Sequence, residues 1–137
     1  MKNDKTDTHE QLFWEEIDRL FPDMIKAIAS LSKKSYLSIT NLRTGITWWS
    51  ERAMDYFGMK ENYTIRGMEK ANRKIHPDDV ATFKRGFKER VDGKNLDTAW
   101  EYRIQDGDSY NRFNAMARVL YDEQKQPFII IIRYDNY

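Results

Sequence analysis

The spacing of apolar residues changes from a helical to a strand period along the chain, and this change restricts the folds that the chain can adopt. Between residues 8 and 35, apolar side chains recur at steps of three and four and share one helical face: Phe13, Ile17, Leu20, Met24, Ile28 and Leu31. From Tyr36 the period is two, as in half-buried strands, and it returns in residues 98–134. Both patterns within 137 residues predict one α+β domain.

The N-terminal region should form a helical segment ahead of the main domain. Residues 1–7 are polar and charged with little to bury, which predicts disorder. Thr8 and Gln11 fit a capping box at the start of a helix. Proline disrupts helical hydrogen bonding, so Pro22 should either kink one helix or separate two, and we favour two helices with Pro22 at the start of the second. Residues 8–35 are therefore expected to be a helical cap or dimerisation segment.

Five strands are predicted in residues 36–137, and they fall into two groups. Residues 36–42 and 45–49 read as one hairpin, and residues 98–105, 109–121 and 127–134 follow at the end of the chain. Strands that follow one another through short turns pair antiparallel. We therefore expect a five-stranded antiparallel sheet with helices on one face.

The segment between the two groups carries helix start and stop signals. Ser50 is a suitable N-cap, and Gly58 stands where a C-terminal cap is needed, so a short helix should lie between them. Residues 60–74 are weakly patterned and predict short helical turns and loop. Pro77 suits the first position of a longer helix that should end at Gly93.

The phrase Ile75-His76-Pro77-Asp78-Asp79 stands just before that longer helix. Together with the order of elements, it resembles the PAS (Per-Arnt-Sim) fold, in the subfamily that carries Ile-His-Pro-Asp-Asp. The resemblance covers Tyr36 to the C-terminus, about three quarters of the chain, and includes further spaced segments: Trp48-Trp49-Ser50, Tyr56-Phe57-Gly58, Trp100 to Ile104, Asp106-Gly107 with Tyr110, and Pro127.

The resemblance implies a sensory module and not an enzyme. Similar modules stand at the N-terminus of bacterial diguanylate cyclases with a GGDEF output domain, which act in cyclic di-GMP signalling, and others precede histidine kinases. The chain is thus expected to bind a small ligand or a partner and to regulate an output domain beyond Tyr137. Ala71 and Arg112 depart from the family pattern near its ligand cavity, so the ligand's identity is not carried over.

Aromatic residues make up 14% of the chain and suggest where such a ligand would bind. In PAS folds the space between sheet and helices often holds a ligand, and rings suit a planar or amphipathic molecule. Filling the core is the ordinary alternative for each ring. Strand parity and helix face select eight cavity candidates: Trp49, Met54, Phe57, Phe83, Phe87, Trp100, Tyr102 and Met116. Arg103 and Arg112 are the predicted polar anchors.

Several chemistries find no support in the residues. The chain has no cysteine, which excludes disulfides, thiolate metal sites and a covalent flavin adduct. His76 precedes Pro77 at a helix start, so we interpret it as a cap and not as a haem or metal ligand. Asp78 and Asp79 complement the helix dipole, and no facing group makes them an acid and base pair. No catalytic or metal-binding residue is therefore predicted.

Charge and hydropathy point to a cytoplasmic chain. The formal net charge is +1, which gives no overall attraction to nucleic acid. The longest apolar run, residues 128–132, has the length of a strand, so no membrane segment is expected.

The N-terminal apolar stripe has two interpretations, to cover its own sheet or to pair with a second subunit. Residues 128–132 are apolar on both sides, so the outer sheet face must be covered. We predict a homodimer whose N-terminal helices pack on this sheet and on each other. Two alternatives remain: a ligandless dimerisation module with a filled core, and a cystatin-like α+β small-molecule binder or enzyme, which would need an Asp and His dyad.

Overall fold

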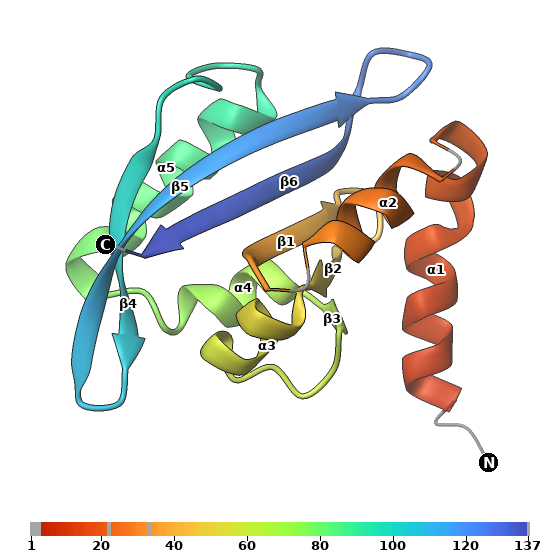
Figure 1. Cartoon of the computed structure of the whole chain (residues 1–137). Helices are drawn as coiled ribbons and strands as arrows, with labels where there is room; N and C mark the ends of the chain where they lie inside the picture. Colours follow the sequence, from red (N-terminus) through yellow and green to blue (C-terminus); the bar gives the residue numbers. More distant parts are fainter. Residues whose placement is uncertain (1–3, 22, 33, 137) are drawn as a thin grey trace.

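The computed structural model describes residues 4–21, 23–32 and 34–136, which form one curved antiparallel sheet with helices on both sides (Figure 1). The six strands are ordered β3-β2-β1-β6-β5-β4. In chain order the elements are α1 (Asp4–Leu20), α2 (Met24–Leu31), β1 (Tyr36–Asn41), β2 (Ile46–Trp49), α3 (Glu51–Phe57), β3 (Tyr63–Ile65), α4 (Gly67–Asn72), the 3-10 turn η1 (Pro77–Asp79), α5 (Val80–Val91), β4 (Trp100–Asp106), β5 (Ser109–Tyr121) and β6 (Pro127–Asn136).

Strand β1 joins the two predicted groups of strands at the centre of the sheet. It pairs antiparallel with β2, where Thr40 lies opposite Thr47, and with β6, where Thr40 lies opposite Ile130. The five predicted strands and the α+β class are therefore confirmed. The sixth strand, β3, pairs with β2 inside the segment predicted as turns and loop. Three residues are too few to show a strand period, which explains why the sequence did not reveal it.

Local signals in the middle of the chain set where the helices begin and end. The hydroxyl of Ser50 accepts a hydrogen bond from the Ala53 N–H at 3.2 Å, which confirms the N-cap of α3. Gly58 ends α3 with φ at 70°, a conformation that glycine adopts at little cost. Pro77 opens η1, and α5 follows directly from Val80. The proline thus begins a 3-10 turn and not the α-helix itself.

The N-terminal region forms two helices, as predicted, but their starts differ. Helix α1 begins at Asp4, so Thr8 lies inside it and is not its N-cap. Helix α2 begins at Met24 after Asp23, whose φ is 65°. Pro22 and residues 1–3, the start of the segment predicted to be disordered, lie outside the described residues. No helix in the described part of the chain is long and apolar enough to cross a membrane.

The sheet separates two hydrophobic cores. The inner core lies between the sheet and the helices α3, α4 and α5. The outer core is covered by α1 and α2, which Figure 1 shows near β1, β2 and β3, whereas α5 lies by β4 and β5. The outer core consists of Phe13, Ile17, Ile25, Leu37, Ile39, Ile46, Phe128 and Ile129.

Two of the predicted dimer-interface residues are used inside the chain. Phe13 and Ile17 have no exposed surface, because they pack in the outer core against their own sheet. Leu20 and Ile28 are partly buried beside them. Of the other two predicted residues, Met24 is 41% exposed and Leu31 is 86% exposed. Any surface that this stripe offers to a second subunit therefore lies on α2.

Candidate functional site

Rings from four elements meet in the inner core. Because side chains alternate along a strand, Trp100 and Tyr102 of β4 point to the same face, which they share with Trp49 of β2. Phe57 of α3 packs on Trp49 with ring centroids 5.1 Å apart. Phe83 of α5 meets Tyr102 edge to face at 4.8 Å. All five were predicted cavity candidates, and the structure brings them together.

The remaining inner candidates border this ring cluster. Met54 of α3 and Phe87 of α5 are partly buried and pack against it. The ring of Phe87 lies 6.3 Å from that of Phe83, measured between centroids. Both residues stand where the helix faces predicted them.

Three predicted site residues lie on the other face of the sheet. Met116 alternates with the buried residues of β5, and it lines a shallow outer pocket of about 280 Å³ with Ile131 and Arg133. Arg103 and Arg112 are opposite one another on β4 and β5, and they line a second outer pocket. The parity assigned to Met116 was wrong, and the two arginines cannot anchor a ligand in the inner core.

Sequence reasoning missed several inner rings. Tyr134 of β6 lies 5.5 Å from Phe57, and Phe113 of β5 lies 5.2 Å from Tyr56, measured between centroids. The signal was present, because Tyr134 shares the parity of Ile130 and Ile132 along β6. The strongly apolar run in β6 hid this alternation.

Three polar atoms in the inner core have no hydrogen-bond partner among the described residues. They are the indole N–H groups of Trp49 and Trp100 and the hydroxyl of Tyr102. Burial raises the pKa of Tyr102 well above its ordinary value, so the hydroxyl keeps its proton. By contrast, the buried hydroxyl of Tyr134 is 3.0 Å from that of Ser38. Buried donors normally have partners, so these three mark a place where an acceptor is missing.

Arg90 is a buried cation at the border of the same core. Its guanidinium lies 3.8 Å from the centre of the Trp100 ring and donates to the carbonyl oxygens of Gly86 and Thr98. Burial lowers the pKa of Arg90. Within the described ranges it forms no ion pair, and its Nε has no partner. Its position seven residues after Phe83, on the buried face of α5, was a signal that the sequence analysis did not use.

The Ile-His-Pro-Asp-Asp phrase closes the free edge of β4. Ile75 forms an isolated bridge with Ile104, and the His76 N–H donates to the Arg103 carbonyl at 2.9 Å. The Asp79 carboxylate accepts from the backbone N–H of Arg103 at 2.8 Å and from its guanidinium at 2.8 and 2.9 Å. These hydrogen bonds from Arg103 hold the pKa of Asp79 below its ordinary value. The phrase thus protects an edge strand from pairing with another chain.

His76 acts as the predicted cap. Its Nδ1 accepts a hydrogen bond from the Asp78 N–H at 3.1 Å, which satisfies a free donor at the start of η1. Its ring also lies 4.6 Å from that of Tyr110. Among the residues that the structure describes, no group of three or more His, Asp or Glu side chains could hold a metal ion.

Comparison with known proteins identifies the architecture. The family described as the PAS fold matches residues 46–132. A sensory box histidine kinase/response regulator from Burkholderia thailandensis superposes with a TM-score of 0.62 at 16% identity, covering 81% of this chain and 82% of that one. The N-terminal domain of a diguanylate cyclase with PAS/PAC sensor from Marinobacter aquaeolei gives 0.59 at 15% identity, covering 75% and 94%.

A third solved structure shows the same likeness. The domain of a putative light and redox sensing histidine kinase from Haloarcula marismortui gives a TM-score of 0.58 at 12% identity and covers 81% of this chain and 97% of that one. No curated protein matches the sequence. At these identities the structural neighbours establish the fold.

Proposed function

The chain belongs to the PAS fold family, and from that premise we propose that it is a cytoplasmic sensory module that binds a small ligand in its inner core and regulates an output domain. Two of the structural neighbours come from proteins described as a histidine kinase/response regulator and as a diguanylate cyclase. They support an output domain of one of these kinds, with the GGDEF cyclase and cyclic di-GMP as our first choice. We assign no catalytic residue to the chain itself.

The unpartnered donors of the inner core carry this proposal. Trp49, Trp100 and Tyr102 belong to the ring cluster and carry N–H and O–H groups that lack acceptors among the described residues. Leaving such a group unsatisfied costs roughly 1–3 kcal/mol, so a bound acceptor would stabilise the folded state. A ligand with a flat apolar body and acceptor atoms at its edges would satisfy both the rings and the donors.

A route from this core to an output domain follows the strand β6. Tyr134 contacts the rings of Phe57 and Tyr102, with centroid separations of 5.5 and 6.5 Å, and it lies near the C-terminal end of β6. A ligand that favours one packing of these rings would therefore bias the position of that strand end. The output domain would respond to this bias, which requires two states of similar free energy.

We propose that the module acts as a homodimer through α2. Met24 and Leu31 expose apolar side chains on this helix, and Leu31, at 86%, is the most exposed large apolar residue in the described part of the chain, so a second subunit that covers it would bury apolar surface. Sedimentation at high concentration measures the association. Leu31→Glu should yield monomers, whereas Leu12→Glu, at a 43% exposed position on α1, should leave the dimer intact. A monomeric wild-type protein would contradict the dimer.

Native mass spectrometry of the purified protein, followed by denaturation, tests the ligand. We expect an extra stoichiometric mass that is released on unfolding. Tyr102→Phe, which removes one donor, should lower ligand occupancy, and Tyr121→Phe at an exposed position should not. Protein that carries no extra mass, and that gains no stability from any tested aromatic acceptor, would favour the alternative of a ligandless dimerisation module with a filled core.

A further inference from the structure

A basic crevice lies between α1 and α4, and none of its lining residues belongs to the proposed ligand site. Its volume is about 480 Å³, and it is lined by His9 of α1, the loop after α3, β3, and Lys70 and Arg73 of α4. We propose that this crevice binds the phosphate group of a small phosphorylated molecule. The inference goes beyond the proposed function and does not depend on it.

The charges around the crevice favour an anion. Lys60, Lys70 and Arg73 line it, whereas Glu61 is the single carboxylate among its lining residues. The three cations form no ion pair within the described residues. Lys70 and Arg73 are three positions apart, which brings them to the same side of the helix end. Since the whole chain has a net charge of only +1, the positive charge is a local feature of this crevice.

His9 adds a buried ring nitrogen that has no hydrogen-bond partner among the described residues. The residue is 8% exposed, and its Nδ1 has no hydrogen-bond partner in the described part of the chain. The nearest carboxylate oxygen, Oε2 of Glu61, is 3.8 Å away, which is too far for a hydrogen bond. A buried polar atom at the wall of a polar crevice requires a partner. A phosphate oxygen in the crevice would accept a hydrogen bond from this ring.

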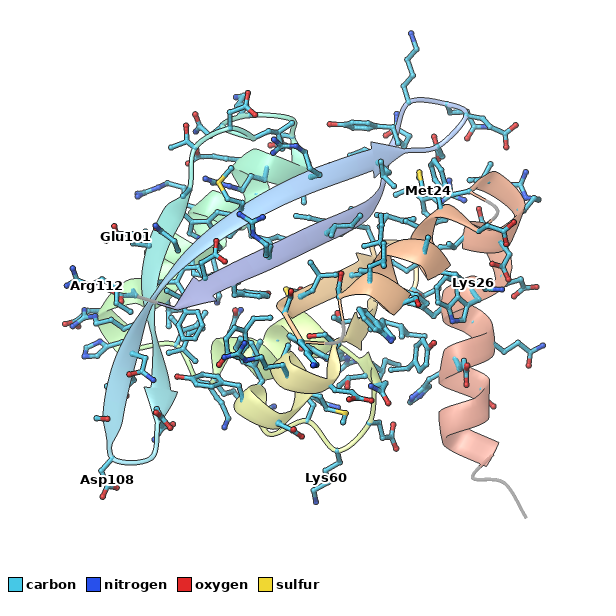
Figure 2. All side chains as sticks on the ribbon, in the orientation of Figure 1. Met24, Lys26, Lys60, Glu101, Asp108 and Arg112 are labelled. Atoms are coloured by element: carbon cyan, nitrogen blue, oxygen red, sulfur yellow. The ribbon has the colours of Figure 1, made fainter. Side chains whose placement is uncertain are left out.

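The size and the remaining walls indicate more than a free ion. A volume of about 480 Å³ lies within the range of roughly 300–1,000 Å³ that is typical of sites for small organic molecules. Met59 and Ile65 supply apolar walls for an organic body. Lys60, another lining residue, extends outward from the loop before β3 (Figure 2). The arrangement fits a phosphate monoester, held at its phosphate by the cations and His9.

A titration followed by NMR or calorimetry tests the site, with adenosine 5′-monophosphate as the probe at constant ionic strength. Inorganic phosphate tests binding of the phosphate group alone, and adenosine tests binding of the organic part without the phosphate. We expect the monophosphate to bind more tightly than either. The double variant Lys70→Glu and Arg73→Glu should weaken this binding at least about tenfold, because it replaces two charge-assisted contacts with repulsion. Both positions are exposed, so the fold should be retained.

Matched variants separate this site from general electrostatic attraction. Lys84→Glu with Lys94→Glu changes the net charge equally at exposed positions outside the crevice, and it should leave the affinity unchanged. His9→Phe should weaken binding, and thermal unfolding of this variant shows whether α1 stays docked. Binding of inorganic phosphate that depends on Lys70 and Arg73 also supports the site.

Three results would overturn the proposal. Adenosine could bind as tightly as the monophosphate, or the Lys84 and Lys94 control could lose as much affinity as the Lys70 and Arg73 variant. The third result is a dissociation constant above about 10 mM for both phosphate and the monophosphate. Each leaves the inner-core ligand untouched, because that ligand is detected by mass and by the Tyr102 variant.

Discussion

The two faces of the sheet are packed in opposite ways. The outer core is mainly aliphatic, and polar groups at its border are paired, as when the Trp14 indole donates to the Tyr63 hydroxyl at 2.7 Å and the Asn41 amide donates to the Phe13 carbonyl at 3.3 Å. The inner core is rich in rings, and the indoles of Trp49 and Trp100 lack partners among the described residues. One face is therefore closed by its own chain, and the other retains unused hydrogen-bonding capacity.

This difference suggests that the outer face supports the fold and that the inner face responds to a ligand. Charged contacts reinforce the closed face, because Arg43 in the turn after β1 bridges Glu16 of α1 and Asp122 of the β5–β6 turn. Such a face suits a stable support. The inner face combines polarizable rings with unsatisfied donors, which suits a site whose packing changes when a ligand binds.

The largest effect is expected from opening the closed face. Phe13→Ala removes a fully buried ring between α1 and the sheet and should lower the free energy of unfolding by about 3–5 kcal/mol, measured by urea denaturation. Leu12→Ala, at a 43% exposed position on the same helix, should change it by less than about 0.5 kcal/mol. Equal effects of the two variants would mean that α1 does not seal the outer face in solution.

A smaller effect is expected when two tyrosines of the inner core lose their hydroxyl groups, and the two should change stability differently. Tyr134→Phe removes a hydroxyl paired with Ser38 and should lower the free energy of unfolding by about 1 kcal/mol. Tyr102→Phe removes an unpaired hydroxyl and should leave stability unchanged or raise it by up to about 1 kcal/mol in ligand-free protein. If Tyr102→Phe destabilises as Tyr134→Phe does, the Tyr102 hydroxyl already has a partner in the purified protein.

The smallest effect is expected at the outer edge of β4, where Asp79 binds Arg103 outside both cores. The pKa of Asp79 is lowered by its hydrogen bonds from Arg103, so the ionised carboxylate stabilises the folded protein. This stabilisation is present above the unfolded pKa of about 4 and is lost as pH falls through the lower folded value.

Asp79→Asn should therefore lower the unfolding temperature at neutral pH, and its difference from wild type should shrink below about pH 4. The matched control is Asp108→Asn, at the tip of the β4–β5 turn (Figure 2), which should lower it little. A difference that stays constant with pH would show that the charge of Asp79 is not what holds Arg103.

Much of the architecture could be predicted, because its signals are local. The cap at Ser50, the left-handed Gly58 and the start at Pro77 each act within one helical turn. The three-residue strand β3 escaped prediction because it forms only by pairing with β2. The start of α1 at Asp4 was missed because a capping signal at Thr8 was given more weight than helix continuation.

The candidate site was predicted in part. Trp100 and Tyr102 were placed correctly, since the alternation along β4 is clear. Met116 was assigned to the wrong face because the inward residues beside it, Ala115 and Ala117, are small and give a weak apolar signal. The sequence predicted Arg103 as a ligand anchor, but in the structure its guanidinium donates to Asp79, a residue 24 positions earlier.

The sequence by itself determined five of the six strands and the caps at Ser50, Gly58 and His76, because these depend on side-chain period and on contacts between near neighbours. Only the tertiary structure decided that Phe13 and Ile17 seal their own sheet, that the segment around His76 covers the β4 edge, and that Tyr102 lacks a partner. Those features arise from segments far apart in the chain. Their hydrogen bonds and burial exist only after β1 has paired with β6 and joined the two groups of strands into one sheet.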